Sequence, residues 1–309
     1  MPVVTIRHTT RYSYHRPVGL GEHRIMFRPQ ESYDQRILDA RLTISPEPAE
    51  LRQVRDVFGN CISVARFAGE ARELSFVSEV TLEHEPAVLT PDDLADAAST
   101  FPVAYDADDL PDLLRCIERQ HADPDRRLER WAHGFLRQDG ATGVLAALSE
   151  MTRAIHTRFS YAQRLAAGCQ TPLQTLERNQ GACRDFAMLM VEAARTLGLA
   201  ARFVSGYVYC ATSAGLAPSN PARKGGGHTH AWAAVYLPNR GWVEFDPTNG
   251  IVGNTDLIRV AVVRDPRQAS PLCGSYDGEA EDFASMQVEV ELNVHSPVER
   301  QAEPLRWVA

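Results

Sequence analysis

The sequence has little of what marks membrane, nucleic-acid-binding or secreted proteins. No apolar run among its 309 residues is long enough to span a bilayer. The N-terminal stretch MPVVTIRHTTRYSYH is strand-like and lacks the apolar core of a signal peptide. Basic residues number 32 against 40 acidic ones, a formal net charge of −8, which disfavours a partner held by a broad basic surface. We therefore expect a cytoplasmic protein that binds neither a membrane nor a nucleic acid.

Cysteine is also sparse and widely spaced. No two of the six cysteines have the C-x-x-C spacing of metal or redox pairs. A chain of this length can build a proper core and does not need a disulfide framework. We expect free thiols in a reducing compartment, and on composition alone each is expected to be a small buried side chain. The six are Cys61, Cys116, Cys169, Cys183, Cys210 and Cys273.

Two kinds of periodicity divide the chain. Residues 1–90 carry β-branched and aromatic residues in partial alternation, with a hairpin turn at DVFGN (56–60), and predict a small all-β domain. Residues 91–309 are predicted to form a second domain, which begins with helices and continues with strands. That order predicts an α+β fold rather than a doubly wound parallel sheet. Between two of the later strands, residues 211–227 are rich in Gly, Ser, Ala and Pro and predict a mobile surface loop.

The elements expected in the second domain can be placed by residue number. The helices lie within 109–120, 126–138, 143–159, 171–178 and 183–197, and the strands lie within 201–210, 230–238, 241–246, 258–265 and 285–294.

Cys183 occupies an unusual place among the six cysteines. It lies at the start of the stretch CRDFAMLMVEAARTLGL, in which apolar residues recur at spacings of three and four, and Gly198 provides a helix stop. The thiol is therefore predicted at a helix N-terminus, where unpaired N–H groups and the helix dipole favour negative charge. Because a thiol is a strong nucleophile only as the thiolate, this position suggests a catalytic cysteine. Such a cysteine needs a histidine, and the histidine needs an orienting carboxylate or amide.

His230 is the best histidine candidate, because it opens the apolar strand HAWAAVYLP. A side chain at a strand end projects into whatever cleft the sheet borders. His228 lies two residues earlier, so a His-x-His zinc site is an alternative. No nearby Cys or Glu offers an obvious set of further ligands, and we expect no metal.

Asp246 is the carboxylate candidate. The turn LPNRG predicts a hairpin of 230–237 with 242–246, which brings the end of the second strand back beside His230 as a cross-strand pair. Glu244, two residues earlier and on the same face, is the alternative. Asp246 matches the end position of His230 better.

Three ordered blocks around these residues resemble a known family. GACRDFAMLMVEAARTLGLAARFVSGYVY, HAW and GWVEFDPTNG are similar to the core of the transglutaminase-like superfamily, closest to its bacterial branch of cysteine proteases. YSYHRPVGLGEHRIMFRPQ (12–30) and DVFGN resemble the β-rich N-terminal domain that accompanies this core in bacteria. The resemblance implies a papain-like fold, with the catalytic helix packed against an antiparallel sheet and the motif core at about 155–250. It also implies Cys183 as nucleophile, His230 as base and Asp246 as orienting acid.

These observations predict thiol-dependent hydrolysis of an amide or peptide bond in a peptide or protein, without a cofactor. The backbone N–H of Cys183 is expected to be one oxyanion donor, and Gln180 and Tyr161 are both open as the second. Protein-glutamine amine transfer is the alternative activity of the same site. A non-catalytic interaction module and a zinc hydrolase using His228 and His230 are the alternatives from other classes. The sequence leaves the natural substrate and the oligomeric state open.

Overall fold

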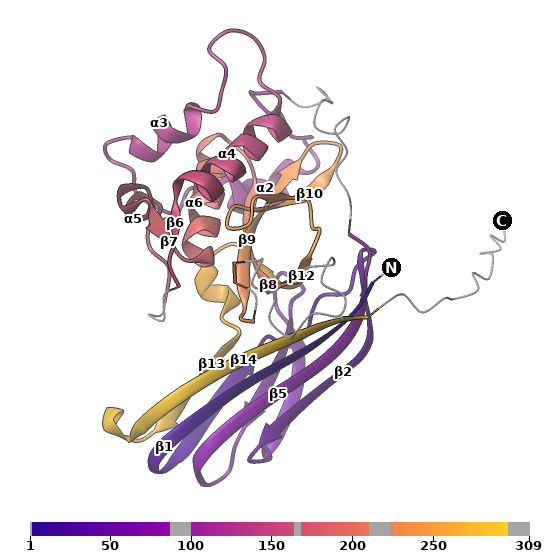
Figure 1. The fold of residues 1–309 in the computed structure, drawn as a ribbon, viewed down its shortest axis with the longest axis vertical. Coiled ribbons are helices and arrows are strands. Elements are labelled where there is room, and N and C mark those ends of the chain that lie inside the picture. The colour runs from indigo at the N-terminus through magenta and orange to yellow at the C-terminus, as the bar shows by residue number, and fades with distance from the viewer. Residues whose placement is uncertain (1, 87–99, 164–167, 210–223, 226, 296–309) are drawn as a thin grey trace, which may run out of the picture.

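The structure is a computed structural model that describes residues 2–86, 100–163, 168–209, 224–225 and 227–295. Figure 1 shows two parts, a long curled sheet below and a smaller sheet covered by helices above. Cys210 and most of the loop expected at 211–227 lie outside the described residues. None of the helices in the described ranges is long and apolar enough to cross a membrane.

The N-terminal residues form the curled sheet. Its strands run in the order β2-β5-β1-β4-β3, and neighbours are antiparallel. The hairpin expected at DVFGN joins β3 to β4, and Asp56 Oδ1 accepts hydrogen bonds from the N–H groups of Phe58 and Asn60, both at 2.9 Å. The all-β prediction for this part is confirmed. Its strands are β1 (Val3–Ile25), β2 (Gln35–Ser45), β3 (Glu50–Arg55), β4 (Cys61–Arg66) and β5 (Glu70–His84).

The C-terminal residues return to this sheet. β13 (Leu272–Asp277) and β14 (Phe283–His295) both pair antiparallel with β1, and η2 (Pro266–Ala269) and η3 (Ala280–Asp282) precede them. The strand expected at 285–294 is therefore present, but it joins the N-terminal sheet and not the sheet formed by the strands that precede it in the chain. The division of the chain at residue 90 stays a prediction, while β13 and β14 belong in space to the N-terminal sheet.

The upper part is an α+β unit, as predicted. Its five-stranded antiparallel sheet has the order β11-β10-β9-β8-β12, and a parallel pair, β6 with β7, lies beside the helices. The helices are α2 (Leu110–Ile117), α3 (Arg127–His133), α4 (Val144–Arg158), α5 (Pro172–Arg178) and α6 (Cys183–Thr196). The strands are β6 (Ser160–Tyr161), β7 (Gln180–Gly181), β8 (Ala201–Val208), β9 (His230–Leu237), β10 (Gly241–Asp246), β11 (Ile251–Val252) and β12 (Leu257–Val263).

α6 lies at the centre of the upper part. The spacing of its apolar residues predicts one buried face, but the helix is buried almost all round. Glu192 and Arg195 can be buried because they pair with each other at 2.9 Å and bond backbone groups of neighbouring segments. The helix ends at Thr196, and Gly198 with φ +81° forms the expected stop, where Leu199 N–H bonds to Ala194 O at 3.0 Å. A helix fixed this firmly holds its N-terminal residue in place.

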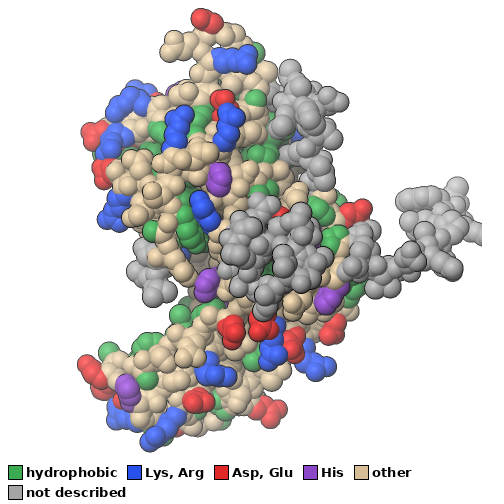
Figure 2. Space-filling model, viewed as in Figure 1, with side chains coloured by type: hydrophobic (Ala, Val, Ile, Leu, Met, Phe, Trp, Pro, Cys, Tyr) green, Lys and Arg blue, Asp and Glu red, His purple; other side chains and the backbone are tan. Residues whose placement is uncertain are grey.

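The two sheets meet at an apolar seam. Val4 and Ile6 of β1 and Leu82 of β5 pack against Tyr207 and Ile258 of the upper sheet. Through this seam the N-terminal sheet supports the strands that carry the candidate site. On the face shown in Figure 2, Lys and Arg side chains are interspersed with Asp and Glu over both parts.

Candidate active site

Cys183 is the first residue of α6 and lies half-exposed in a cleft of about 370 Å³. Asp185 fixes the turn that leads into the helix, because its carboxylate accepts hydrogen bonds from Ala182 N–H at 2.9 Å and Gln170 N–H at 2.7 Å. The cleft is also lined by His230 of β9 and by residues of η2. The helix N-terminus thus presents the thiol to a space that a substrate can enter.

His230 and Asp246 lie together at the ends of β9 and β10, and both side chains are buried. His230 Nε2 is 2.8 Å from Asp246 Oδ2. Asp246 Oδ1 accepts the backbone N–H of Thr248 at 2.8 Å, and Asn249 Nδ2 donates to Oδ2 at 2.8 Å. The carboxylate is therefore fully hydrogen-bonded, and it holds the ring by one nitrogen.

The charges of this pair follow from its contacts. Burial disfavours a charged imidazole, but the Asp246 carboxylate and then the Cys183 thiol outweigh burial and raise the pKa of His230 to about 10. Burial also disfavours a charged carboxylate, yet His230, Asn249 and Thr248 together hold the pKa of Asp246 below its usual range. At neutral pH the pair is an imidazolium bound to a carboxylate.

The other ring nitrogen of His230 faces the thiol. Nδ1 has no partner of ordinary hydrogen-bond geometry among the described residues, although the Cys183 thiol is close enough to help raise the pKa of the ring. The two groups are adjacent, and contacts of this kind commonly tighten when substrate binds. The structure thus brings together all three residues that the sequence singled out, and their catalytic role stays a prediction.

The alternatives considered from the sequence lie elsewhere. Glu244 binds Arg259 at 2.8 Å and is not a partner of His230. His228 is exposed, and within the described ranges no three His, Cys, Asp or Glu side chains are grouped as metal ligands. Asp246 is also not directly opposite His230, because the hairpin register pairs Phe245 with Ala233. The contact is diagonal, which the long imidazole ring can span.

Asn249 was missed by sequence reasoning. Besides donating to Asp246, it accepts the N–H of Lys224 at 2.9 Å and donates to the Lys224 carbonyl at 3.2 Å. It therefore connects the buried pair to the segment just before β9. In the sequence, Asn249 stands in DPTNG, where it reads as an ordinary turn residue.

Gly225, next to Lys224, covers the ring of His230. Its φ is +89°, and a Cβ built on it would lie 2.5 Å from His230 Nδ1. Only a residue without a side chain can approach the ring edge this closely. No local signal in the glycine-rich stretch distinguishes Gly225 from its neighbours.

Two aromatic side chains complete the surroundings. Trp232 is fully buried and stacks on His230, with ring centroids 5.9 Å apart. Tyr161 lies near the site, where burial and then the charge of Cys183 raise its pKa to about 12. Tyr161 therefore keeps its hydroxyl proton as a donor. Gln180, the other residue named as an oxyanion donor, has an exposed side chain in β7.

Two known families match separate stretches of the sequence. The bacterial transglutaminase-like N-terminal region matches residues 4–83, and the transglutaminase-like superfamily matches residues 131–247. Together they account for more than half of the chain, and the second match contains Cys183, His230 and Asp246.

Individual proteins resemble the chain over nearly its whole length. A solved structure of a candidate cysteine protease from Cytophaga hutchinsonii superimposes with a TM-score of 0.71 at 19% identity, covering 99% of this chain and 94% of that one. An uncharacterised protein of Mycobacterium tuberculosis is 28% identical over 285 residues, 87% of this chain and 86% of its own. An uncharacterised protein of Mycobacterium leprae is 24% identical over 291 residues, 92% of this chain and 96% of its own.

Proposed function

The chain belongs to the transglutaminase-like superfamily, and on that premise we propose that it is a thiol-dependent enzyme that hydrolyses an amide or peptide bond. The observation that carries the proposal is the buried His230–Asp246 pair, whose free ring nitrogen faces the half-exposed thiol of Cys183. The substrate we propose is a peptide or protein, because the cleft is open to solvent beside the thiol.

The first half of the reaction forms an acyl-enzyme. In the proposed resting state the proton of the Cys183 thiol has already passed to His230, because Asp246 stabilises the imidazolium. Cys183 Sγ then attacks the substrate carbonyl carbon, and a C–S bond forms while the carbonyl oxygen becomes an oxyanion. When the oxyanion collapses, the C–N bond breaks, and the leaving nitrogen takes the proton from His230 Nδ1. The products are a free amine and a thioester on Cys183.

The second half regenerates the enzyme. Water attacks the thioester carbon while His230 Nδ1 accepts one of its protons. Collapse of this intermediate breaks the C–S bond, releases the acid and returns the proton to the thiol–imidazole pair. Throughout the cycle Asp246 holds Nε2 and stabilises the imidazolium, and it does not itself take the proton.

Oxyanion stabilisation comes from groups near the helix N-terminus. The backbone N–H of Cys183, at the first position of α6, is free of the helix ladder and can donate to the oxyanion. We propose Tyr161 as the second donor, because it lies near Cys183 and retains its hydroxyl proton. Gln180 is less suited, because its side chain is exposed.

A peptide library tests the proposal with its controls in the same chain. Incubation of the full-length protein with mixed peptides should give new free acids and amines, and rapid acid quenching should trap a thioester on Cys183. Cys183→Ala should abolish both signals. Cys61→Ala should leave both unchanged, because Cys61 lies in the N-terminal sheet.

Adding a primary amine at increasing concentration separates hydrolysis from amine transfer. We expect free acid to exceed new amide, because water is in large excess in an open cleft. Amide that overtakes acid at millimolar amine would make the protein a transglutaminase in activity. Absence of both products and of any trapped thioester would contradict the enzyme proposal and favour a non-catalytic interaction module.

A further inference from the structure

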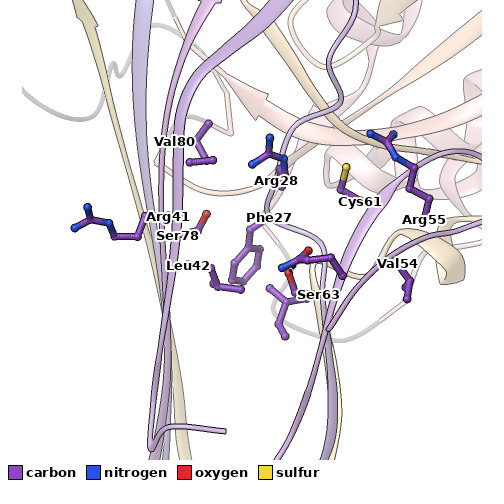
Figure 3. A pocket seen from close by; sticks show the side chains of 13 residues that line it. Phe27, Arg28, Arg41, Leu42, Val54, Arg55, Cys61, Ser63, Ser78 and Val80 are labelled. Atoms are coloured by element: carbon purple, nitrogen blue, oxygen red, sulfur yellow. Dashed lines mark hydrogen bonds between the residues drawn. The ribbon is translucent and has the colours of Figure 1, made fainter. Parts of the chain in front are cut away.

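The N-terminal sheet forms a second cavity, of about 460 Å³ and partly open to solvent, that the catalytic proposal does not use (Figure 3). One wall comes from β2 and β5 and the other from β3 and β4, and Phe27, after β1, lies between them. This volume falls in the range of small-molecule sites in proteins. Among the described residues that line it, none is a histidine, aspartate or glutamate. The cavity therefore lacks a general base beside Cys61, which also lines it.

The two walls differ in chemistry. Leu42 and Val80 give the β2–β5 wall a mostly apolar surface, with the hydroxyl of Ser78 between them. On the other wall Gln53 is paired with Ser63 across β3 and β4, and the Ser63 hydroxyl donates to Gln53 Oε1 at 3.0 Å. That bond uses the oxygen of Gln53, a lining residue, and leaves its amide N–H₂ as a donor. One side of a ligand here would meet hydrocarbon and the other would meet donors.

Positive charge lies along one edge of the cavity. In Figure 3 the guanidinium groups of Arg28 and Arg55 lie along the same edge as the Cys61 thiol, whereas Arg41 points away. Arg28 approaches Glu31 only at 3.9 Å, and both side chains are about half-exposed, so the pair is weak. Arg55 donates to the Gly59 carbonyl at 3.1 Å, which uses one of its five N–H groups. Both guanidinium groups thus have donors left for an anion.

We propose that this cavity binds an organic carboxylate with an apolar body. Guanidinium groups match carboxylates in shape and charge, and the apolar wall would take the attached hydrocarbon. The same chemistry is presented by a free medium-chain acid and by a peptide segment in which an acidic residue adjoins an apolar one. The inference rests on the N-terminal sheet alone and does not depend on the proposed hydrolysis.

The test uses the full-length protein and two probes, octanoate and a short peptide containing Leu-Glu. Binding is measured by calorimetry, and Cys61 serves as a local reporter because an occupied cavity should slow its alkylation. Cys273 is exposed and outside the cavity, so its alkylation rate is the internal control. We expect at least one probe to bind and to protect Cys61 but not Cys273. Protection by octanoate alone would indicate a free acid, and protection by the peptide alone would indicate a peptide segment.

Charge variants separate specific binding from general stickiness. Arg28→Gln and Arg55→Gln should each weaken binding about tenfold, as expected for loss of a charge-assisted bond. Arg41→Gln is the matched control and should bind as the parent does. 1-Octanol, which lacks the carboxylate, should bind at least about tenfold more weakly than octanoate.

Several results would overturn the proposal. These are no binding of either acid, equal binding of octanol and octanoate, unprotected Cys61, or an equal loss in Arg41→Gln. Far-UV circular dichroism and the melting temperature check that each variant folds. The octanol comparison needs no variant, so the proposal stays testable even if an arginine variant does not fold.

Discussion

Three of the four buried histidines in the described part of the chain lie in two regions and differ in charge, two being neutral and one protonated. At the seam between the sheets, His8 Nδ1 is 2.8 Å from the Tyr207 hydroxyl, and His84 Nδ1 is 2.7 Å from the Tyr209 hydroxyl. Burial lowers the pKa of His8 and of His84 to about 4. At the candidate active site, Asp246 outweighs the effect of burial and raises the pKa of His230 to about 10.

The difference cannot come from burial, because the exposed fractions of His8, His84 and His230 are 1%, 0% and 1%. The difference in pKa comes from the group that each histidine contacts. Burial raises the pKa of Tyr207 and Tyr209, so both phenols stay neutral and cannot compensate a charged ring. A buried histidine whose partner is neutral stays neutral and serves only in packing. A buried histidine whose partner is a carboxylate stays protonated, and at His230 that proton lies beside the thiol.

Replacing Asp246, the partner of His230, should have the largest effect on turnover. In Asp246→Ala, only the nearby Cys183 thiol opposes the effect of burial, so the pKa of the His230 ring should fall. Turnover should drop by about 10³- to 10⁴-fold, and Asp246→Asn should be milder because the amide oxygen still accepts the ring N–H. NMR titration of the His230 ring and initial rates measure the two effects. His8→Gln is the control, and unchanged turnover in Asp246→Ala would remove the carboxylate from the mechanism.

The two regions should give the stability curve opposite slopes with pH. His8 and His84 are held neutral when folded but take protons near pH 6.5 when unfolded, so stability should fall as pH drops from 6.5 to about 4. The loss is about 3 kcal/mol per histidine at most. In the folded protein His230 keeps its proton to a higher pH than in the unfolded chain. Its contribution to stability is therefore complete below pH 6.5 and is lost as pH rises toward 10.

Urea unfolding at several pH values measures both slopes. The double variant His8→Gln, His84→Gln should flatten the acid side and leave turnover unchanged. Asp246→Asn should flatten the alkaline side. An acid slope that persists in the double variant would show that other groups destabilise the fold there.

Adding a methyl group at Gly225, which covers the edge of the His230 ring, should have an intermediate effect on turnover. In Gly225→Ala the new methyl group would collide with His230 Nδ1, and turnover and Cys183 alkylation should fall by about 10- to 100-fold. Gly241→Ala is the matched control, because its φ is +73° but no atom lies within 4 Å of the added Cβ. If both variants lose activity equally, backbone strain and not contact with the ring is responsible.

Loss of the Asn249 contacts should have the smallest effect. Asn249→Ala removes one of the donors that hold Asp246 and frees the Lys224 backbone, and kcat should fall about tenfold with little change in KM. Asn249→Asp can still accept from Lys224 N–H but cannot donate to Asp246, so it separates the two roles. A shift in the pH–rate profile of both variants is the signature of a positioning residue. A change in melting temperature alone would indicate a purely structural one.

The elements that carry the site could be predicted from the sequence because their signals are local. α6 has helical spacing and a glycine stop, and the β9–β10 hairpin has a turn of Pro, Asn and Gly between alternating strands. Those two elements already bring a cysteine, a histidine and an aspartate within reach of one another. The fold class and the superfamily were predicted correctly for the same reason.

The remaining features depend on contacts between distant residues. The alternation in β14 predicts a strand but does not say which sheet it joins, and it pairs with β1. Tyr207 is 199 residues from His8, and Tyr209 is 125 residues from His84. The bonds of Asn249 to Lys224 span 25 residues and involve backbone atoms, which leave no trace in the residue pattern.

Site-resolved alkylation tests the central claim most directly. Substoichiometric iodoacetamide at pH 6, followed by mass spectrometry of all six cysteines, ranks their reactivity in one experiment. The account predicts that Cys183 is labelled first and that this preference disappears in His230→Ala. Labelling of the exposed Cys273 or of Cys61 ahead of an unmodified Cys183 would contradict it.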